Sequence, residues 1–332
     1  MAIIGANNLG IIDIAKRLDP NGDTADVAEM LSQSNQIVLD IPFVEGNLPT
    51  GNQSTIRTGY PATVWRKLYQ GTPPSKSTTA QVTDTCRMLE ARSEADVKAV
   101  NMANDPATFR LDESHAFIEK MGQDFCTALL YGDTSINPEQ FYGFTPRYST
   151  IAGGGTSQNI INAGGSGADN TSIWMVGWGK RTVFGIYPKN SKAGLSHRDL
   201  GEGDAFDGSN NRFRAYMDLY QWDCGLVVKD WRYVVRIANI DVSDLSSGTG
   251  TMANQKLIDL LIDAKHRFPT LDGVMPRLYG NRTVRAALDK MALNKSSNAL
   301  SIREAAGQFQ TTFLDIPIGT VDQILNTEAV VS

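Results

Sequence analysis

Few side chains in this chain of 332 residues have the types and spacing that catalysis or metal binding requires. The three histidines, His115, His197 and His266, are far apart in the sequence, and each fits a surface or helix-end position. The sequence contains no HExxH pair, no clustered cysteine and histidine ligands and no EF-hand calcium loop. The residue types therefore predict no catalytic residue, no bound metal and no cofactor.

Glycine-rich and acidic segments also lack a functional spacing. The clusters at 153–155 and 164–167 match neither GxGxxG nor GxxxxGK[ST], and 164–168 does not fit the GxSxG nucleophile pattern. The acidic stretch 199–208 could attract a cation but lacks the alternating ligand positions of a calcium loop. The glycine clusters indicate a surface loop or a junction, and an enzyme with an unrecognised site is the weakest interpretation.

Composition narrows the class of protein further. The chain has 31 basic and 36 acidic residues, a net charge of −5, without a basic patch dense enough for sequence-specific DNA binding. Cys86, Cys126 and Cys224 are odd in number and scattered, which argues against a disulfide framework and indicates small buried side chains. No apolar run approaches the roughly 18 residues of a membrane span, and no signal peptide is expected.

Residues 47–90 form a long extended stretch with almost no core of its own. Threonine and aromatic residues favour strands here, and glycine and proline divide the stretch into at least two runs. Both faces of the last run, 75–90, are polar, and a strand pair without a hydrophobic face is marginal in water. Such an open ribbon needs another surface. The stretch predicts an arm that a neighbouring copy completes.

The strongest helix signal follows this arm. Phe117, Met121, Phe125 and Leu129 recur every four residues, which predicts a helix over 112–131 with an N-cap at Asp112 and a glycine stop after it. Two further helices are expected within the first 35 residues, and a short strand at 38–44.

The rest of the chain mixes strands and helices. Residues 172–187 predict a hairpin that turns at Gly179–Lys180, and 213–222 with 224–240 predict a second strand pair. The tryptophans of this block, Trp174, Trp178, Trp222 and Trp231, are expected in the core. Helices capped by Thr251 and Asn281, a capping box at 301–304 and a strand at 311–318 follow. Without regular βαβ alternation, the fold class is α+β.

Several runs together resemble one protein family. They are RTGYPATVWRKL at 57–68, SKSTTAQV at 75–82, MLEARS at 88–93, DNTSIW at 169–174, GIYPK at 185–189 and GLVVKDWRYVVRIANI at 225–240. Their order and number resemble the major capsid proteins of tailed bacteriophages, in particular the short-tailed epsilon-15-like group. The resemblance covers essentially the whole chain.

This resemblance implies an HK-97-like fold with an N-terminal arm (1–44), an extended E-loop (45–90), a P domain (91–244) with a spine helix at 112–131 and the β block, and an A domain with the C-terminal strand (245–332). It also implies an icosahedral shell of pentamers and hexamers around double-stranded DNA, assembled in the cytoplasm of the bacterial host. Expected partners are a separate scaffolding protein, a portal and a cement or decoration protein.

Residues expected at contacts between subunits lie in the arm and at one helix start. They are Arg57, Trp65, Arg66, Lys67 and Lys76 in the arm, and Arg282 and Arg285 at the start of an A-domain helix. The second interpretation belongs to a different class of protein, a carbohydrate-binding or tail-associated virion module that uses the tryptophan-rich β block.

Overall fold

A computed structural model describes residues 35–102, 105–247, 254–293, 300–305 and 308–332 of the chain. The two helices predicted before residue 35 and the N-cap predicted at Thr251 lie outside the described residues. In the described part, no helix is both long and apolar enough to cross a membrane.

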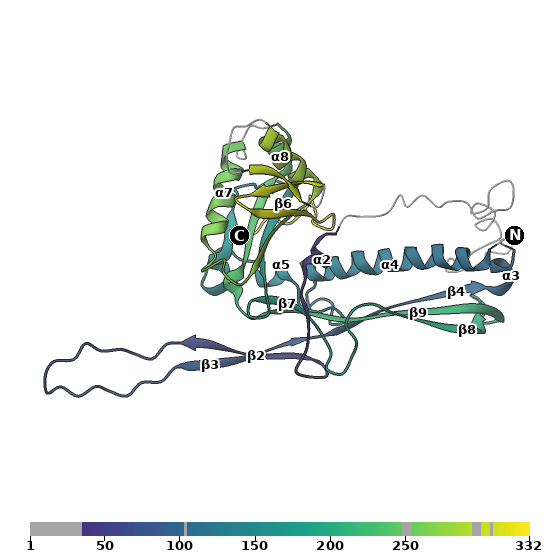
Figure 1. Cartoon of the computed structure of the whole chain (residues 1–332), viewed down its shortest axis with the longest axis horizontal. Helices are drawn as coiled ribbons and strands as arrows, with labels where there is room; N and C mark the ends of the chain where they lie inside the picture. Colours follow the sequence, from purple (N-terminus) through teal and green to yellow (C-terminus); the bar gives the residue numbers. More distant parts are fainter. Residues whose placement is uncertain (1–34, 103–104, 248–253, 294–299, 306–307) are drawn as a thin grey trace.

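The molecule has three parts, and in Figure 1 the arm and the long helix extend in opposite directions below the third part, a lobe. A two-stranded arm of β2 (Gly51–Gly59) and β3 (Thr78–Thr85) extends away from the body. A long helix, α4 (Pro106–Tyr131), lies along a ribbon of β4 (Arg87–Asp96), β9 (Arg212–Val228) and β8 (Ser196–Phe206). An upper lobe contains β6 (Asn170–Trp178), α7 (Asn254–His266) and α8 (Arg282–Leu293).

The long helix begins earlier than predicted. Its N-cap is Asp105, whose carboxylate accepts hydrogen bonds from the backbone N–H groups of Ala107 (3.0 Å) and Thr108 (3.4 Å). Pro106 fits the first helical position because no intrahelical N–H bond is needed there. The predicted start at Asp112 was therefore wrong. The predicted end is confirmed, since the helix ends at Tyr131 and Gly132 follows.

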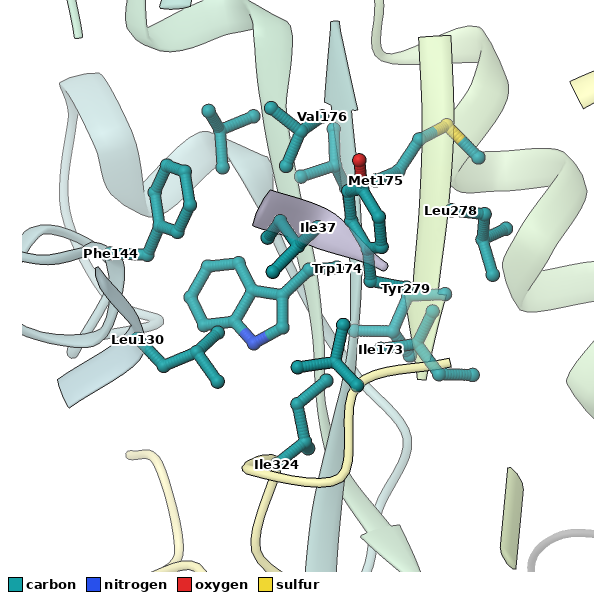
Figure 2. Packing of buried hydrophobic residues seen from close by; sticks show 14 of the residues in the cluster. Ile37, Leu130, Phe144, Ile173, Trp174, Met175, Val176, Leu278, Tyr279 and Ile324 are labelled. Carbon is teal, nitrogen blue, oxygen red and sulfur yellow. The ribbon is translucent and has the colours of Figure 1, made fainter. Parts of the chain in front are cut away.

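The core of the upper lobe forms around β6, which is buried along its whole length. β6 lies antiparallel between β10 (Val234–Asp241) and β11 (Met275–Gly280), and β11 continues the sheet to β14 (Ile316–Thr320). Figure 2 shows Trp174 of β6 among Ile37, Phe144 and Tyr279. Trp174, Trp178 and Trp222 are buried, which confirms their predicted place in the core, whereas Trp231 is only partly buried against it.

The predicted pairing of the β block was wrong. A tight turn does occur where Gly179 donates to the Val183 carbonyl, but β7 (Val183–Tyr187) then leaves β6 and pairs with β9 and β1 (Phe43–Glu45). β7 is buried from Val183 to Ile186 and has partners on both edges, which a simple hairpin does not supply. The second predicted pair placed a boundary between 222 and 224. Instead, β9 runs without a turn from Arg212 to Val228, and β10 follows it.

Other predicted boundaries also change. Residues 38–44 divide into α2 (Ile37–Asp40) and β1 rather than one strand, and 301–304 lie in β12 (Leu300–Ala305) rather than in a helix cap. A turn at Leu314 and Asp315, both with positive φ, separates β13 (Gln308–Phe313) from β14 and interrupts the strand predicted at 311–318. The cap at Asn281 is confirmed by its bond from the Val284 N–H (2.9 Å).

Short elements connect these parts. They are α3 (Val97–Val100), α5 (Phe144–Arg147), α6 (Val242–Ser247), β5 (Ile160–Asn162), and the 3-10 turns η1 (Gly155–Asn159) and η2 (Trp231–Tyr233).

A buried ion pair ties the C-terminal segment to the sheet and to the long helix. Arg236 of β10 contacts the Glu328 carboxylate at 2.9 Å, and the two side chains are only 2% and 5% exposed. The guanidinium also donates to the Tyr148 carbonyl and the Ser172 hydroxyl, and the Tyr131 hydroxyl donates to Glu328. Burial, with the adjacent Glu328 charge, raises the pKa of Tyr131. Every charge in this cluster is therefore paired or hydrogen-bonded.

Replacing Glu328 by glutamine should strongly destabilise the unassembled subunit. The substitution keeps the side-chain shape but leaves the Arg236 guanidinium buried without a countercharge, which costs about 3–5 kcal/mol. Urea unfolding measures the change. The matched control is Lys120→Ala, which removes the exposed Lys120–Asp124 pair and should cost less than about 1 kcal/mol. Equal effects of the two substitutions would contradict this role for the buried pair.

Candidate assembly interface

The arm is a hydrogen-bonded ribbon without an apolar face. β2 and β3 pair antiparallel from Gly51 opposite Thr85 to Gly59 opposite Thr78, with one irregularity near Arg57. Contacts between side chains across the ribbon are polar, as in the bond from the Gln53 amide to Gln81 (3.2 Å). Backbone hydrogen bonds thus hold the two strands together, and the strand pair buries little apolar surface.

Beyond the paired strands, the tip of the arm (residues 60–77) packs against nothing in its own subunit. Every residue from 60 to 79 is exposed. Trp65 and Tyr69 are as exposed as in an extended chain, at 101% and 104%, and Tyr60 and Leu68 are nearly so. Clustered apolar side chains on a soluble protein mark interaction surfaces. The tip therefore has the features of a surface that a partner covers.

A buried ion pair fixes the arm at its root. Arg147, at the end of α5, contacts the Asp84 carboxylate of β3 at 2.8 Å, with side chains 13% and 6% exposed. The guanidinium also lies over the Tyr142 ring at 4.8 Å. Gly51 is needed here because its φ is +156° and a Cβ would lie 2.1 Å from the Asp84 carbonyl oxygen. These contacts couple the direction of the arm to the end of the long helix.

The arm residues predicted for the interface are all exposed. All five lie on or beyond β2 and are solvent-exposed: Arg57, Trp65, Arg66, Lys67 and Lys76. The sequence did not identify Arg147 and Asp84, which are 63 positions apart. No local pattern joins two such residues, so their contact emerges only from the fold.

The two other predicted residues lie elsewhere, at the start of α8 in the upper lobe. Arg282 contacts Asp322 at 2.8 Å, and Arg285 contacts Asp289 at 3.2 Å. Arg285 also donates to the Ile318 carbonyl. Both guanidinium groups thus already have partners within the subunit.

Side chains whose chemistry would suit catalysis or metal binding are used here in contacts between structural elements. Arg110 of α4 contacts Asp199 of β8 (3.0 Å) and Asp218 of β9 (2.9 Å), and His197 contacts the same Asp218. The Gly201 N–H, and then Arg110, lower the pKa of Asp199. No group of three histidine, cysteine or carboxylate side chains that could hold a metal ion occurs among the described residues. Within the acidic stretch, Asp199 therefore joins β8 to the long helix.

Removing Arg147 should loosen the arm without unfolding the body. In Arg147→Met, the buried Asp84 carboxylate loses its countercharge, so the root of the arm should open more often. We expect amide hydrogen exchange in β2 and β3 to rise at least about tenfold, equivalent to about 1.4 kcal/mol, with β6 and β10 unchanged. Arg232→Met, which removes the more exposed Arg232–Asp230 pair, serves as the control. Unchanged exchange in the arm would contradict this anchoring role.

Comparison with known proteins gives consistent matches. Residues 19–332 match the family model described as major capsid protein GP7. A chain in the near-atomic structure of bacteriophage epsilon15 is 35% identical over 100% of both chains, with a TM-score of 0.79. The bacteriophage JBD30 capsid covers 90% of this chain and 95% of its own, at 9% identity and a TM-score of 0.50, and so shows a shared fold alone. No curated protein matches the chain.

Proposed function

Because this chain belongs to the family of major capsid protein GP7, we propose that its arm links subunits by lying across the next copy in the shell. The protein is a shell-forming capsid protein of the virion, with the HK-97-like α+β fold that the sequence resemblance predicted. Many copies of the chain assemble into that shell. The proposal concerns how one copy holds the next.

The exposed tip carries this proposal. Three aromatic side chains, Tyr60, Trp65 and Tyr69, project without packing partners in their own subunit. Each aromatic side chain buries about 150–250 Å² when covered. Together they supply a large share of the roughly 800 Å² that each partner contributes to a standard interface. In a shell every subunit has a neighbouring copy, and the surface of that copy covers the tip.

Charge supports the same arrangement. Residues 57–76 contain four cations and no acidic residue, so the remaining chain has a net charge of −9 against −5 for the whole. A basic tip on an acidic body favours contact between copies, because unlike charges attract and like patches repel. Arg57, Arg66, Lys67 and Lys76, with Trp65, are the contact residues of this proposal.

The parts of the chain take the following roles in the proposal. Residues 1–44 act as the N-terminal arm and 45–90 as the E-loop, of which 51–85 form the ribbon while β4 begins at Arg87. Residues 91–244 act as the P domain around α4, and 245–332 as the A domain. Arg282 and Arg285 lie at contacts of the A domain, where they also hold Asp322 and Asp289.

Further partners belong to the same proposal. The copies form pentamers and hexamers, and the shell encloses double-stranded DNA without reading its sequence. A separate scaffolding protein, a portal and a cement or decoration protein contact it, and assembly takes place in the host cytoplasm. The chain acts structurally, without a catalytic site, in keeping with the use of Arg110, His197 and Asp218 in contacts between elements.

Shortening the arm tests the proposal. Residues 60–77 are replaced by Asn-Gly, a two-residue hairpin turn that joins Gly59 to its partner Thr78. We expect a subunit with an unchanged urea midpoint that forms no shells in negative-stain micrographs, because the surface that reaches the neighbour is gone. The control keeps the tip length but replaces exposed Gly71 by serine, and should assemble normally. Normal shells from the shortened arm would refute the proposal.

A further inference from the structure

We propose that the arm tip of one subunit docks in a groove at the arm root of the next, with Trp65 as the inserted side chain. This inference rests on the proposed function, since it requires that the arm crosses a neighbour. It specifies which surface receives the tip. The groove lies where β4, the end of α4 and the segment before α5 meet.

Two adjoining cavities form the groove. The first, of about 370 Å³, has a mixed lining whose apolar part includes Leu89, Phe125, Ala128 and Phe141. The second, of about 450 Å³, extends beside Pro49, Thr50 and Pro188 at the base of the arm. Both are lined by Arg87 and Met88, and the Met88 side chain is 76% exposed between them. A partly apolar hollow thus opens to solvent beside the root of each arm.

The first cavity suits a single large side chain. Its volume is near the lower end of the roughly 300–1,000 Å³ of small-molecule sites, so it admits one or two side chains rather than a folded segment. Phe125 and Phe141 line it, and their ring centroids lie 5.7 Å apart. Aromatic rings pack favourably at such distances. Tryptophan is enriched among the side chains that dominate interface energetics, and Trp65 is the one fully exposed tryptophan of the arm.

The charges at the groove complement those of the tip. Asp124 and Glu139 line the first cavity and Asp223 lines the second, against the one arginine, Arg87. Asp124 also contacts Lys120 at the surface, so Glu139 and Asp223 carry the net negative charge of the rim. The basic side chains that flank Trp65 are Arg66 and Lys67. The groove therefore carries negative charge around a partly apolar cavity, whereas the side chains beside Trp65 are positive.

The tip cannot reach the groove of its own subunit. The paired strands span eight residue steps from Gly51 to Gly59, about 26 Å at the usual rise, and the tip begins beyond them. Figure 1 shows the arm extending away from the body. Pro49 and Thr50, which line the second cavity, directly precede β2 at the base of the arm. Two complementary surfaces that cannot meet within one chain form head-to-tail contacts between chains, and such contacts give rings when the rotation between copies closes. A second copy is therefore the occupant that the geometry selects.

Cross-linking between two differently marked chains tests the contact. Full-length chains carrying Val64→Cys or Met88→Cys are coexpressed, assembled into shells and treated with a short bis-maleimide. Both substituted side chains are exposed, and Val64 precedes Trp65 without replacing it. Burial raises the pKa of the Cys86 and Cys126 thiols to about 12 and also raises that of Cys224, so the native thiols react slowly at neutral pH. Wild-type shells give the background.

The expected result is a covalent dimer of the two marked chains, at least tenfold above the yield from a control pair. The control pairs Val64→Cys with Met275→Cys, a half-exposed position on β11 outside the groove. If the Met88 pair gives no more dimer than the Met275 pair in intact shells, the groove assignment is wrong. Loss of shells in the Asn-Gly variant would then still support the crossing arm, so the two proposals fail separately.

Charge reversal gives a second readout that does not depend on the introduced thiols. Glu139→Lys should lower shell yield at least tenfold with an unchanged urea midpoint, and Arg66→Glu with Lys67→Glu in the same chain should restore it. Asp272→Lys, an exposed site in the upper lobe, is the matched control. Wild-type yield from Glu139→Lys would overturn the proposed docking. If marked chains assemble poorly, excess wild-type chain restores the shells in which the cross-link is measured.

Discussion

The arm satisfies its backbone hydrogen bonds but buries almost no apolar surface, and this imbalance governs how the subunit works. Paired strands without a hydrophobic face gain little stability in water. Beyond the pairing, Trp65 and Tyr69 are fully exposed. A free subunit therefore leaves apolar area in contact with water that only another molecule can cover. In the proposed contact, covering this segment on the next copy contributes free energy to joining the copies.

Contacts in the rest of the subunit fix the root of the arm and therefore the direction in which it extends. The Arg147–Asp84 pair joins the root of the arm to α5, which follows the long helix closely in the chain. β9 pairs with β4 and β8 along the long helix and, without a break, with β7 near the root of the arm. One strand therefore connects these two regions. Arg236 and Glu328 fix the C-terminal segment against the same framework. The body therefore holds together independently, and the arm stays free for contact.

How much of the fold could be predicted depends on how far apart in the sequence the interacting residues lie. The end of α4 follows from a four-residue period and Gly132, and the exposed arm follows from its polar pattern, so both were predicted. The helix start was missed because Asp105 and Asp112 are both good caps, and Pro106 decided between them. Strand partners were missed because β6 pairs with β11, roughly a hundred residues away, and burial on both faces removes the alternation that would show register.

The candidate site divides in the same way. Its exposed half, around Trp65, lies in one contiguous segment and could be recognised from residue types alone. Its proposed receiving half is assembled from residues between Pro49 and Cys224, on several elements, and had no local signal. Arg147 and Asp84 are likewise far apart in the sequence. A segment that acts outside its own subunit can thus be recognised from its residue types. The surface that receives it can be identified only once the fold is known.

The most direct test of a neighbour-completed arm is amide hydrogen exchange of residues 60–77 in free subunits and in assembled shells. These residues are exposed in the subunit and should exchange rapidly there. The account predicts that exchange at the tip slows at least about tenfold on assembly, more than for the β6 core, which is already protected. Equal exchange of the tip in shells and in free subunits would contradict it.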